Sequence, residues 1–171
     1  DLDKLSGGIV VREARAAEPL ELLDGQQLEL KPDTLVIADR AGPLAIAGIM
    51  GGQASAVSES TTNIMLEAAF FAPDLLSGKA RSYGLHTESS HRFERGVDFE
   101  LQLEAMERAS QLLLSIVGGE AGPIEQAVSA EHLPQRPPVK LRAERIGKML
   151  GLELPPAEVE PPVVSQLRDV G

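Results

Sequence analysis

The feature that most limits the fold of this chain is a change of hydrophobic pattern at Pro73. Before Pro73, short apolar segments with a period of two alternate with turn residues, which is typical of β-strands. After it, the apolar residues between 101 and 116 recur at helical spacing, and Gly118-Gly119 would end that helix. Strands followed by helices predict an α+β fold, with a mixed or antiparallel sheet and one long helix packed on it.

The strands of the first part can be assigned from turns and alternation. Asp24-Gly25 separates two apolar-rich arms and predicts a β-hairpin over Leu20–Leu30. Further strands are expected at Ile9–Arg12, Thr34–Ala38, Leu44–Ile49 and Asn63–Ala68. In the last of these, the alternation puts Glu67 on the less hydrophobic side of the strand.

The second part predicts two helices and a return to β-structure. Pro73 suits the first turn of a helix to about Arg81, and Gly84 would end it. Asp98 would cap the longest helix, which should run to Val117. Another strand is expected at Ile124–Val128.

A proline-rich stretch, Pro134–Pro138, predicts a linker and divides the chain into domains 1–134 and 135–171. The second domain should open with a strand at Val139–Arg142 and a helix at Ala143–Leu150. The run from Pro155 starts like a helix, but Pro161-Pro162 would break it, so the last dozen residues are expected to be kinked or poorly ordered.

Composition excludes several kinds of site. The 171 residues include no cysteine, so disulfides and thiolate metal sites are excluded, and no metal site is expected from the scattered His86, His91 and His132. No segment approaches the roughly 20 apolar residues of a membrane helix. The net charge of −10 argues against binding nucleic acid over the whole surface. The window Lys79–Arg95 is nevertheless net positive, with four basic and two acidic residues.

Three features could carry chemistry. The glycines of Gly48–Gly52 allow a sharp turn and close approach of a ligand, although a simple tight turn explains them better. Glu67 lies among apolar residues and either faces solvent, the favoured interpretation from the residues alone, or lines a pocket. The polar segment Arg81–Asp98 is either a solvated loop or a functional one. A Ser–His hydrolase built from Ser89 or Ser90 with His86 or His91 lacks a strained turn and a third partner.

The polar segment also carries a resemblance. Residues 84–98 (GLHTESSHRFERGVD) resemble a signature of the bacterial phenylalanyl-tRNA synthetase β-subunit family. Four more blocks occur in the order and at the spacing of that family: LVIAD at 35–39, AGIMGG at 47–52, LEAAFF at 66–71 and GGEAGP at 118–123. The resemblance covers about Gly7 to Gly151.

The resemblance implies a fragment, truncated at both ends, of a modular subunit. Residues 1–134 are similar to most of the B3/B4 editing domain, which hydrolyses tyrosine wrongly attached to tRNA(Phe). Residues 135–171 are similar to the start of the helix-turn-helix-like B5 module. The implied parent is a cytoplasmic enzyme, an α2β2 heterotetramer that binds tRNA(Phe) and joins phenylalanine to it with ATP and Mg²⁺ on the α subunit. No cofactor is implied for this fragment.

The family's editing pocket can be transferred residue by residue. Glu67 matches the acid that receives the tyrosine phenol, Thr87 a polar pocket residue, and Ser89 a small residue that leaves room for the ring. His86 is adjacent and could donate to the ester or to water. The substrate-binding loop would include Gly48, Gly51 and Gly52, and backbone N–H groups near Gly51 and Gly52 could stabilise an oxyanion. Arg81, Arg92 and Arg95 are either possible tRNA contacts or structural partners of Glu94 or Asp98.

The implied chemistry is physically coherent. A pocket shaped for phenylalanine cannot strongly reject a near-isostere that only adds a hydroxyl group, so a second site must recognise that hydroxyl. A carboxylate in a partly apolar cleft would accept the phenol O–H and stay unsatisfied with phenylalanine. Two alternatives remain: a structural or tRNA-docking module without editing, and a free-standing editing protein of similar fold, against which the B5-like start argues.

Overall fold

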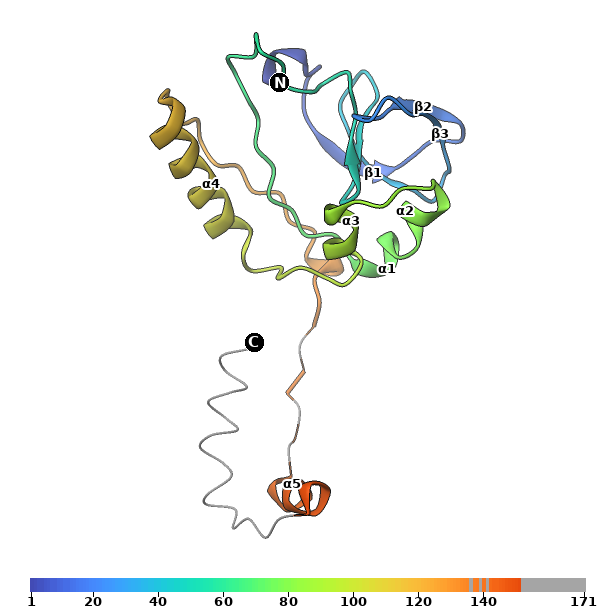
Figure 1. The fold of residues 1–171 in the computed structure, drawn as a ribbon, viewed down its shortest axis with the longest axis vertical. Helices are drawn as coiled ribbons and strands as arrows, with labels where there is room; N and C mark the ends of the chain where they lie inside the picture. The colour runs from blue at the N-terminus through green and yellow to red at the C-terminus, as the bar shows by residue number, and fades with distance from the viewer. Residues whose placement is uncertain (136, 139, 141, 152–171) are drawn as a thin grey trace. The chain divides into compact units, whose positions relative to one another are not determined.

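The computed structural model describes residues 1–135, 137–138, 140 and 142–151 of the chain (Figure 1). The chain divides into two compact units, Asp1–Pro134 and Gln135–Gly171. Unit 1 begins with the short 3-10 helix η1 (Leu2–Lys4) and contains the strands β1 (Val10–Glu13), β2 (Glu18–Glu21), β3 (Gln27–Leu30), β4 (Leu35–Ala38), β5 (Pro43–Ile46) and β6 (Met50–Gly51). Its helices are α1 (Pro73–Leu76), α2 (Lys79–Ser82), α3 (Glu88–Phe93), α4 (Gln102–Val117) and the 3-10 helix η2 (Ala130–His132). The predicted α+β class is confirmed.

The strands form two antiparallel sheets. The larger sheet has the order β1-β4-β5-β6, and β2 pairs with β3 in the smaller one. In the larger sheet Val10 lies opposite Ala38, and Val36 lies opposite Ile46. The predicted hairpin is confirmed: Gly25 has a φ of 85°, and the Asp24 carboxylate accepts a hydrogen bond from the Gln26 N–H at 3.0 Å.

Strand β4 lies at the centre of the core because both of its faces are covered. Val36 and Ala38 are fully buried on one face, against the β2–β3 hairpin. Ile37 points to the other face, into a cluster with Ala47, Phe71 and Leu76. A strand buried on both faces reads as a continuous apolar run, as this one does.

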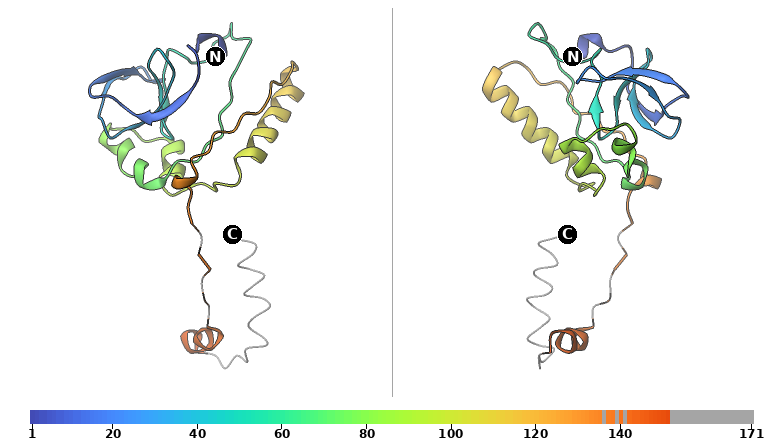
Figure 2. Two further views of the ribbon diagram at one scale, coloured as in Figure 1. Left: turned by 180° about the vertical axis from the view of Figure 1, so that it is seen from behind. Right: turned by 45° about the vertical axis from the view of Figure 1, so that its right-hand side comes forward.

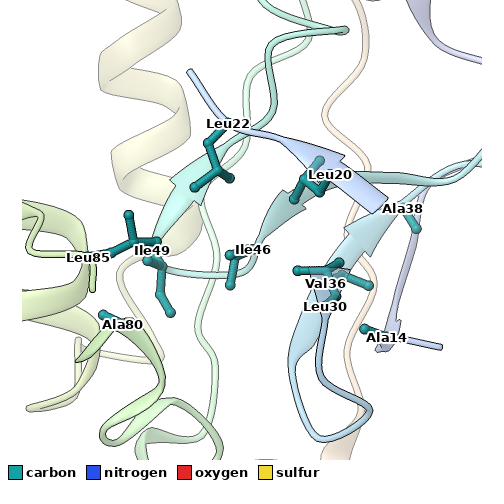
Figure 3. Close-up of a cluster of buried hydrophobic side chains, with 10 residues drawn as sticks. All are labelled: Ala14, Leu20, Leu22, Leu30, Val36, Ala38, Ile46, Ile49, Ala80 and Leu85. Carbon is teal, nitrogen blue, oxygen red and sulfur yellow. The ribbon is translucent and has the colours of Figure 1, made fainter. Parts of the chain in front are cut away.

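The larger hydrophobic cluster joins the sheets to α2 and to the segment that follows it. It consists of Ala14, Leu20, Leu22, Leu30, Val36, Ala38, Ile46, Ile49, Ala80 and Leu85. Figure 3 shows Ile49 between the strand side chains and the two residues contributed by the helical region, Ala80 and Leu85. A polar contact fixes the same junction, because the Tyr83 hydroxyl bonds to Thr34 Oγ1 at 2.5 Å and accepts from the Lys31 N–H at 2.8 Å.

A buried aspartate fixes the turn between β4 and β5. The Asp39 carboxylate accepts hydrogen bonds from the backbone N–H groups of Ser6, Ala41 and Gly42. These bonds, the one from Ser6 foremost, lower the pKa of Asp39 below its ordinary value because they favour the charged form. Asp39 therefore holds the N-terminal segment against the sheet.

Two predicted strands are wrong. Neither Asn63–Ala68 nor Ile124–Val128 is a strand, and both segments are irregular. An apolar alternation makes a strand only where a neighbouring strand supplies hydrogen-bond partners, and within the described residues neither segment has one. Residues 61–72 instead run between the sheet and α4 (Figures 1 and 2).

The helices also differ from the prediction. The single helix expected from Pro73 to Arg81 is divided into α1 and α2, because Gly78 adopts a φ of 73° between them. The cap at Asp98 is wrong: α4 begins at Gln102, and the Asp98 carboxylate accepts from the Glu100 N–H. The long helix is present, but none of its residues is buried, so the expected packing on the sheet is not observed.

Among the described residues of unit 2, one helix is present. Helix α5 (Ala143–Leu150) is confirmed, and it ends at Gly151 in the left-handed conformation, with a φ of 67°. Two residues of the expected strand Val139–Arg142, and the whole run beyond Gly151, lie outside the described residues.

An ion pair between β1 and β2 predicts how stability depends on pH. Arg12 donates to the Glu18 carboxylate from its two terminal nitrogens, Nη2 at 2.7 Å and Nη1 at 2.9 Å. This contact lowers the pKa of Glu18 to about 2. The Glu18 side chain is 9% exposed, so solvent screens the pair only partly. Because the pKa of Glu18 is lower in the folded protein than in the unfolded chain, the ion pair stabilises the fold at pH values above the pKa of the unfolded chain. This stabilisation is lost as the pH falls towards the pKa that Glu18 has in the folded protein.

Glu18→Gln is therefore expected to lower the free energy of unfolding at pH 7 by about 1–3 kcal/mol. Urea unfolding at a series of pH values measures the difference, which should shrink between pH 4.5 and 2. Glu29→Gln, an equal change of charge at an exposed position of β3, is the control. An equal loss of stability in both variants would contradict a specific role for the pair.

Candidate functional site

A cavity of about 650 Å³ lies beside the turn between β5 and β6. Its walls come from β4–β6, from residues 67–69, from α3, and from the segment that leads into α4. Most of the lining is apolar: Leu23, Ile37, Ala45, Ile46, Ile49, Met50, Ala68, Ala69, Phe93, Val97, Leu101 and Ala105. The polar side chains at the cavity are Glu67, Ser89, Asp98 and Gln102. A largely apolar cavity with a few polar groups is the usual form of a small-molecule site.

Glu67 is the notable polar group of this cavity. Its carboxylate has no hydrogen-bond or ion-pair partner among the described residues. The residue is exposed, because the cavity is open to solvent, yet the surrounding protein displaces enough water to raise the pKa of its carboxyl group. An acid with a pKa raised by desolvation in a cavity is a candidate for ligand binding. The structure thus places Glu67 at a pocket and not on the solvated face of a strand.

The glycine turn shapes one wall of the cavity. Gly48 has a φ of 66°, and a Cβ there would stand 3.0 Å from the side chains of Leu76 and Phe93. Gly51 also lines the cavity. Gly52 does not: it is buried, and its N–H donates to the Leu44 carbonyl at 2.6 Å. The expected use of the Gly52 N–H as an oxyanion donor is therefore wrong.

Two hydroxyl groups hold α3 against the glycine turn. Thr87 Oγ1 donates to the Ile49 carbonyl at 2.9 Å, and Ser89 Oγ donates to the Gly48 carbonyl at 2.9 Å. Thr87 also caps α3, because its Oγ1 accepts from the Ser90 N–H while Ser90 Oγ accepts from the Thr87 N–H. Ser89 lines the cavity, whereas Thr87 supports its wall from behind.

His86 lies elsewhere. It lines a second, polar cavity of about 400 Å³, together with Ala80, Arg81, Leu85, Thr87, Glu88, Ser90, His91, Glu94 and Arg95. The residues transferred from the family resemblance are thus divided: Gly48, Gly51, Glu67 and Ser89 meet at the first cavity, and His86 and Thr87 at the second.

The three arginines do not form one group. Arg81 and Arg95 line the second cavity, and Arg92 lines neither. Glu94, considered as a structural partner for them, forms no ion pair with any of the three among the described residues. Arg95 donates from one guanidinium nitrogen to the His91 carbonyl at 2.8 Å.

Sequence reasoning missed two polar residues of the first cavity. Asp98 was interpreted as a helix cap, although it lies before the cap and at the cavity. Gln102 was not among the predicted site residues, but its side-chain amide donates to the Asp98 carbonyl at 2.7 Å. A sequence signal for both residues does exist: Asp98 ends the polar segment Arg81–Asp98, and Gln102 is the polar first residue of the long helix that follows it.

The described residues contain no group of three or more His, Cys, Asp or Glu side chains that could hold a metal ion. No helix among them is both long and apolar enough to cross a membrane.

Comparison with known proteins shows the family of this chain. The B3/4 domain family matches residues 1–118, which include all lining residues of both cavities. This chain belongs to the B3/4 domain family. The phenylalanine–tRNA ligase β subunits of Pseudomonas putida, Hahella chejuensis and Methylococcus capsulatus are 63%, 58% and 59% identical to it over 161, 160 and 159 residues. These alignments cover 94%, 94% and 93% of the chain and 20% of each relative, so the chain spans about a fifth of their length.

The glycine turn of this B3/4 domain gives a test of the site's construction. Gly48→Ala forces a side chain into the left-handed region and against Leu76 and Phe93, and should destabilise the domain by about 2–4 kcal/mol. Gly84→Ala is the matched control, because Gly84 has a φ of 70° but no atom within 4 Å of the added carbon. Thermal unfolding of both variants separates backbone strain from the clash, and an equal loss in the two would show that the contact is unimportant.

Proposed function

We propose that this chain works as the editing part of a phenylalanine–tRNA ligase β subunit and removes tyrosine from wrongly charged tRNA(Phe). The observation that supports this most is the Glu67 carboxylate, unpartnered among the described residues, at an otherwise mainly apolar cavity. The similarity to phenylalanine–tRNA ligase β subunits over 94% of the chain supplies the class of substrate.

In this proposal the first cavity recognises the tyrosine side chain. The ring occupies the apolar space, which is within the range of about 300–1,000 Å³ found for small-molecule sites. The phenol O–H donates to the Glu67 carboxylate. Phenylalanine has no such donor and would leave the partly desolvated carboxylate without a partner. A hydrogen bond to a charged group contributes about 1.5–3 kcal/mol, which corresponds to a preference of about 10- to 100-fold for tyrosine.

The chemical step is the hydrolysis of an ester. The oxygen of a water molecule attacks the carbonyl carbon, the ester bond to the terminal ribose breaks, and a proton from the water passes to the ribose oxygen. The products are free tyrosine and uncharged tRNA. The cavity contributes by holding the ester in place.

The rest of the proposed enzyme follows from the resemblance. The parent would be an α2β2 synthetase of the cytoplasm, with ATP- and Mg²⁺-dependent ligation on the α subunit, and unit 2 would open the B5 module. No step proposed for this chain passes through a metal ion.

Replacement of Glu67 tests the proposal in the complete synthetase. Glu67→Ala should slow the hydrolysis of tyrosyl-tRNA(Phe) by roughly 10- to 100-fold, because the phenol loses its acceptor. Charging of tRNA(Phe) with phenylalanine should not change. Glu29→Ala, the same truncation at an exposed position of β3 that lines neither cavity, is the control. Unchanged clearance of tyrosine in Glu67→Ala would reject the editing role and leave a structural or docking module.

A steric variant tests the cavity independently of charge. Ser89→Trp would place an indole in the space proposed for the tyrosine ring, so hydrolysis of tyrosyl-tRNA(Phe) should be lost. Ser82→Trp, at an exposed position of α2, should keep it. Thermal midpoints and phenylalanine charging, measured on both variants, show that the protein is folded. Full hydrolysis by folded Ser89→Trp would place the ring elsewhere.

A further inference from the structure

The proposed function gives the second cavity no role in the recognition of the amino acid, although this cavity is the more polar of the two. Its walls are the end of α2, residues 85–87 and one side of α3. Two arginines, two glutamates and two histidines lie around about 400 Å³. A space of this size accommodates a small ligand or one unit of a polymer.

The two arginines retain most of their donor capacity. Arg81 has no hydrogen bond or ion pair among the described residues, and Arg95 uses one nitrogen for the His91 carbonyl. Both residues are exposed, and Glu88 and Glu94 lie at the same cavity without forming an ion pair with either. The guanidinium groups can therefore bind an oxyanion without first breaking a contact within the protein.

The mixture of charges selects the class of ligand. A simple anion would be repelled by Glu88 and Glu94, and a simple cation by Arg81 and Arg95. A nucleotide unit of RNA suits both, because its phosphate accepts from arginine and its ribose hydroxyls donate to carboxylates. The chain as a whole has a charge of −10, so any contact with RNA has to be local, as this one is.

The second cavity lies next to the first, because neighbouring residues of one segment line the two cavities. Thr87, Glu88 and Ser90 line the second cavity, and Ser89 of the same helical turn lines the first. Thr87 also donates to the carbonyl of Ile49, which is a wall residue of the first cavity. A chain of nucleotides held in the second cavity would end near the first.

We propose that the second cavity binds the nucleotides next to the 3′ end of an RNA, with Arg81 and Arg95 on the phosphates and Glu88 or Glu94 on ribose hydroxyls. This inference rests on the proposed function, since the RNA is the carrier of the amino acid to be removed. It divides the task between two cavities: one recognises the side chain and the other positions the nucleic acid.

The experiment measures the affinity of uncharged tRNA(Phe) for the synthetase that contains this chain, over a series of salt concentrations. Each phosphate contact contributes about 0.7–0.9 to the slope of log K against log salt concentration. Arg81→Gln and Arg95→Gln should each lower the slope by about that amount, and the double variant by about twice as much. Arg92→Gln is the matched control, because Arg92 is an exposed arginine of α3, close in sequence to Arg95, that lines neither cavity.

To isolate the contribution of this chain, the same series is repeated with the 171-residue chain and a single-stranded RNA of the tRNA 3′ end. Weaker binding in both arginine variants, with Arg92→Gln close to wild type, would support the proposal. Unchanged slopes in the arginine variants, an equal effect of Arg92→Gln, or no detectable binding of RNA by the wild-type chain would overturn it.

The use of uncharged RNA separates this inference from the editing proposal. If Glu67→Ala clears tyrosine normally while Arg81→Gln and Arg95→Gln weaken RNA binding, the editing proposal fails and the RNA site stands. If Glu67→Ala slows clearance while the arginine variants bind RNA normally, the editing proposal stands and the RNA site fails.

Discussion

The candidate site depends on two hydrogen bonds that join α3 to the glycine turn between β5 and β6. Thr87 and Ser89 donate to consecutive backbone carbonyls, those of Ile49 and Gly48. The turn can approach the helix so closely only because residue 48 has no side chain. These contacts bring segments about 40 residues apart in sequence into one wall, with an apolar cavity on one side and a polar cavity on the other.

The two cavities differ in the kind of interaction that they offer. In the first, an acid faces mainly apolar groups, and loss of water raises its pKa, so a single hydroxyl on a ligand can decide whether the carboxylate is satisfied. In the second, charges of both signs remain in contact with water, which suits a ligand that is itself charged and hydroxylated. The proposed selectivity for the amino-acid side chain and the proposed binding of nucleic acid therefore fall in neighbouring but separate cavities.

Local sequence signals predicted the elements that rest on local causes. The hairpin at Asp24-Gly25 and the end of α5 at Gly151 follow from turn and cap chemistry and are confirmed. The predicted strands at Asn63–Ala68 and Ile124–Val128 are wrong, because a strand needs a partner strand and the local apolar pattern does not show whether one is present. For the site, the resemblance selected Glu67, Ser89, Gly48 and Gly51, which the structure gathers at one cavity. The separation of His86 from them, and the presence of Asp98, depend on tertiary geometry.

The most direct test of the central claim is a crystal structure of the synthetase with a non-hydrolysable tyrosyl-adenosine analogue. The ring is expected to lie in the first cavity, between the glycine turn and Ser89, with the phenol oxygen within hydrogen-bond distance of the Glu67 carboxylate. A ring bound elsewhere, or a phenol that points to solvent while Glu67 stays without a partner, would contradict this claim.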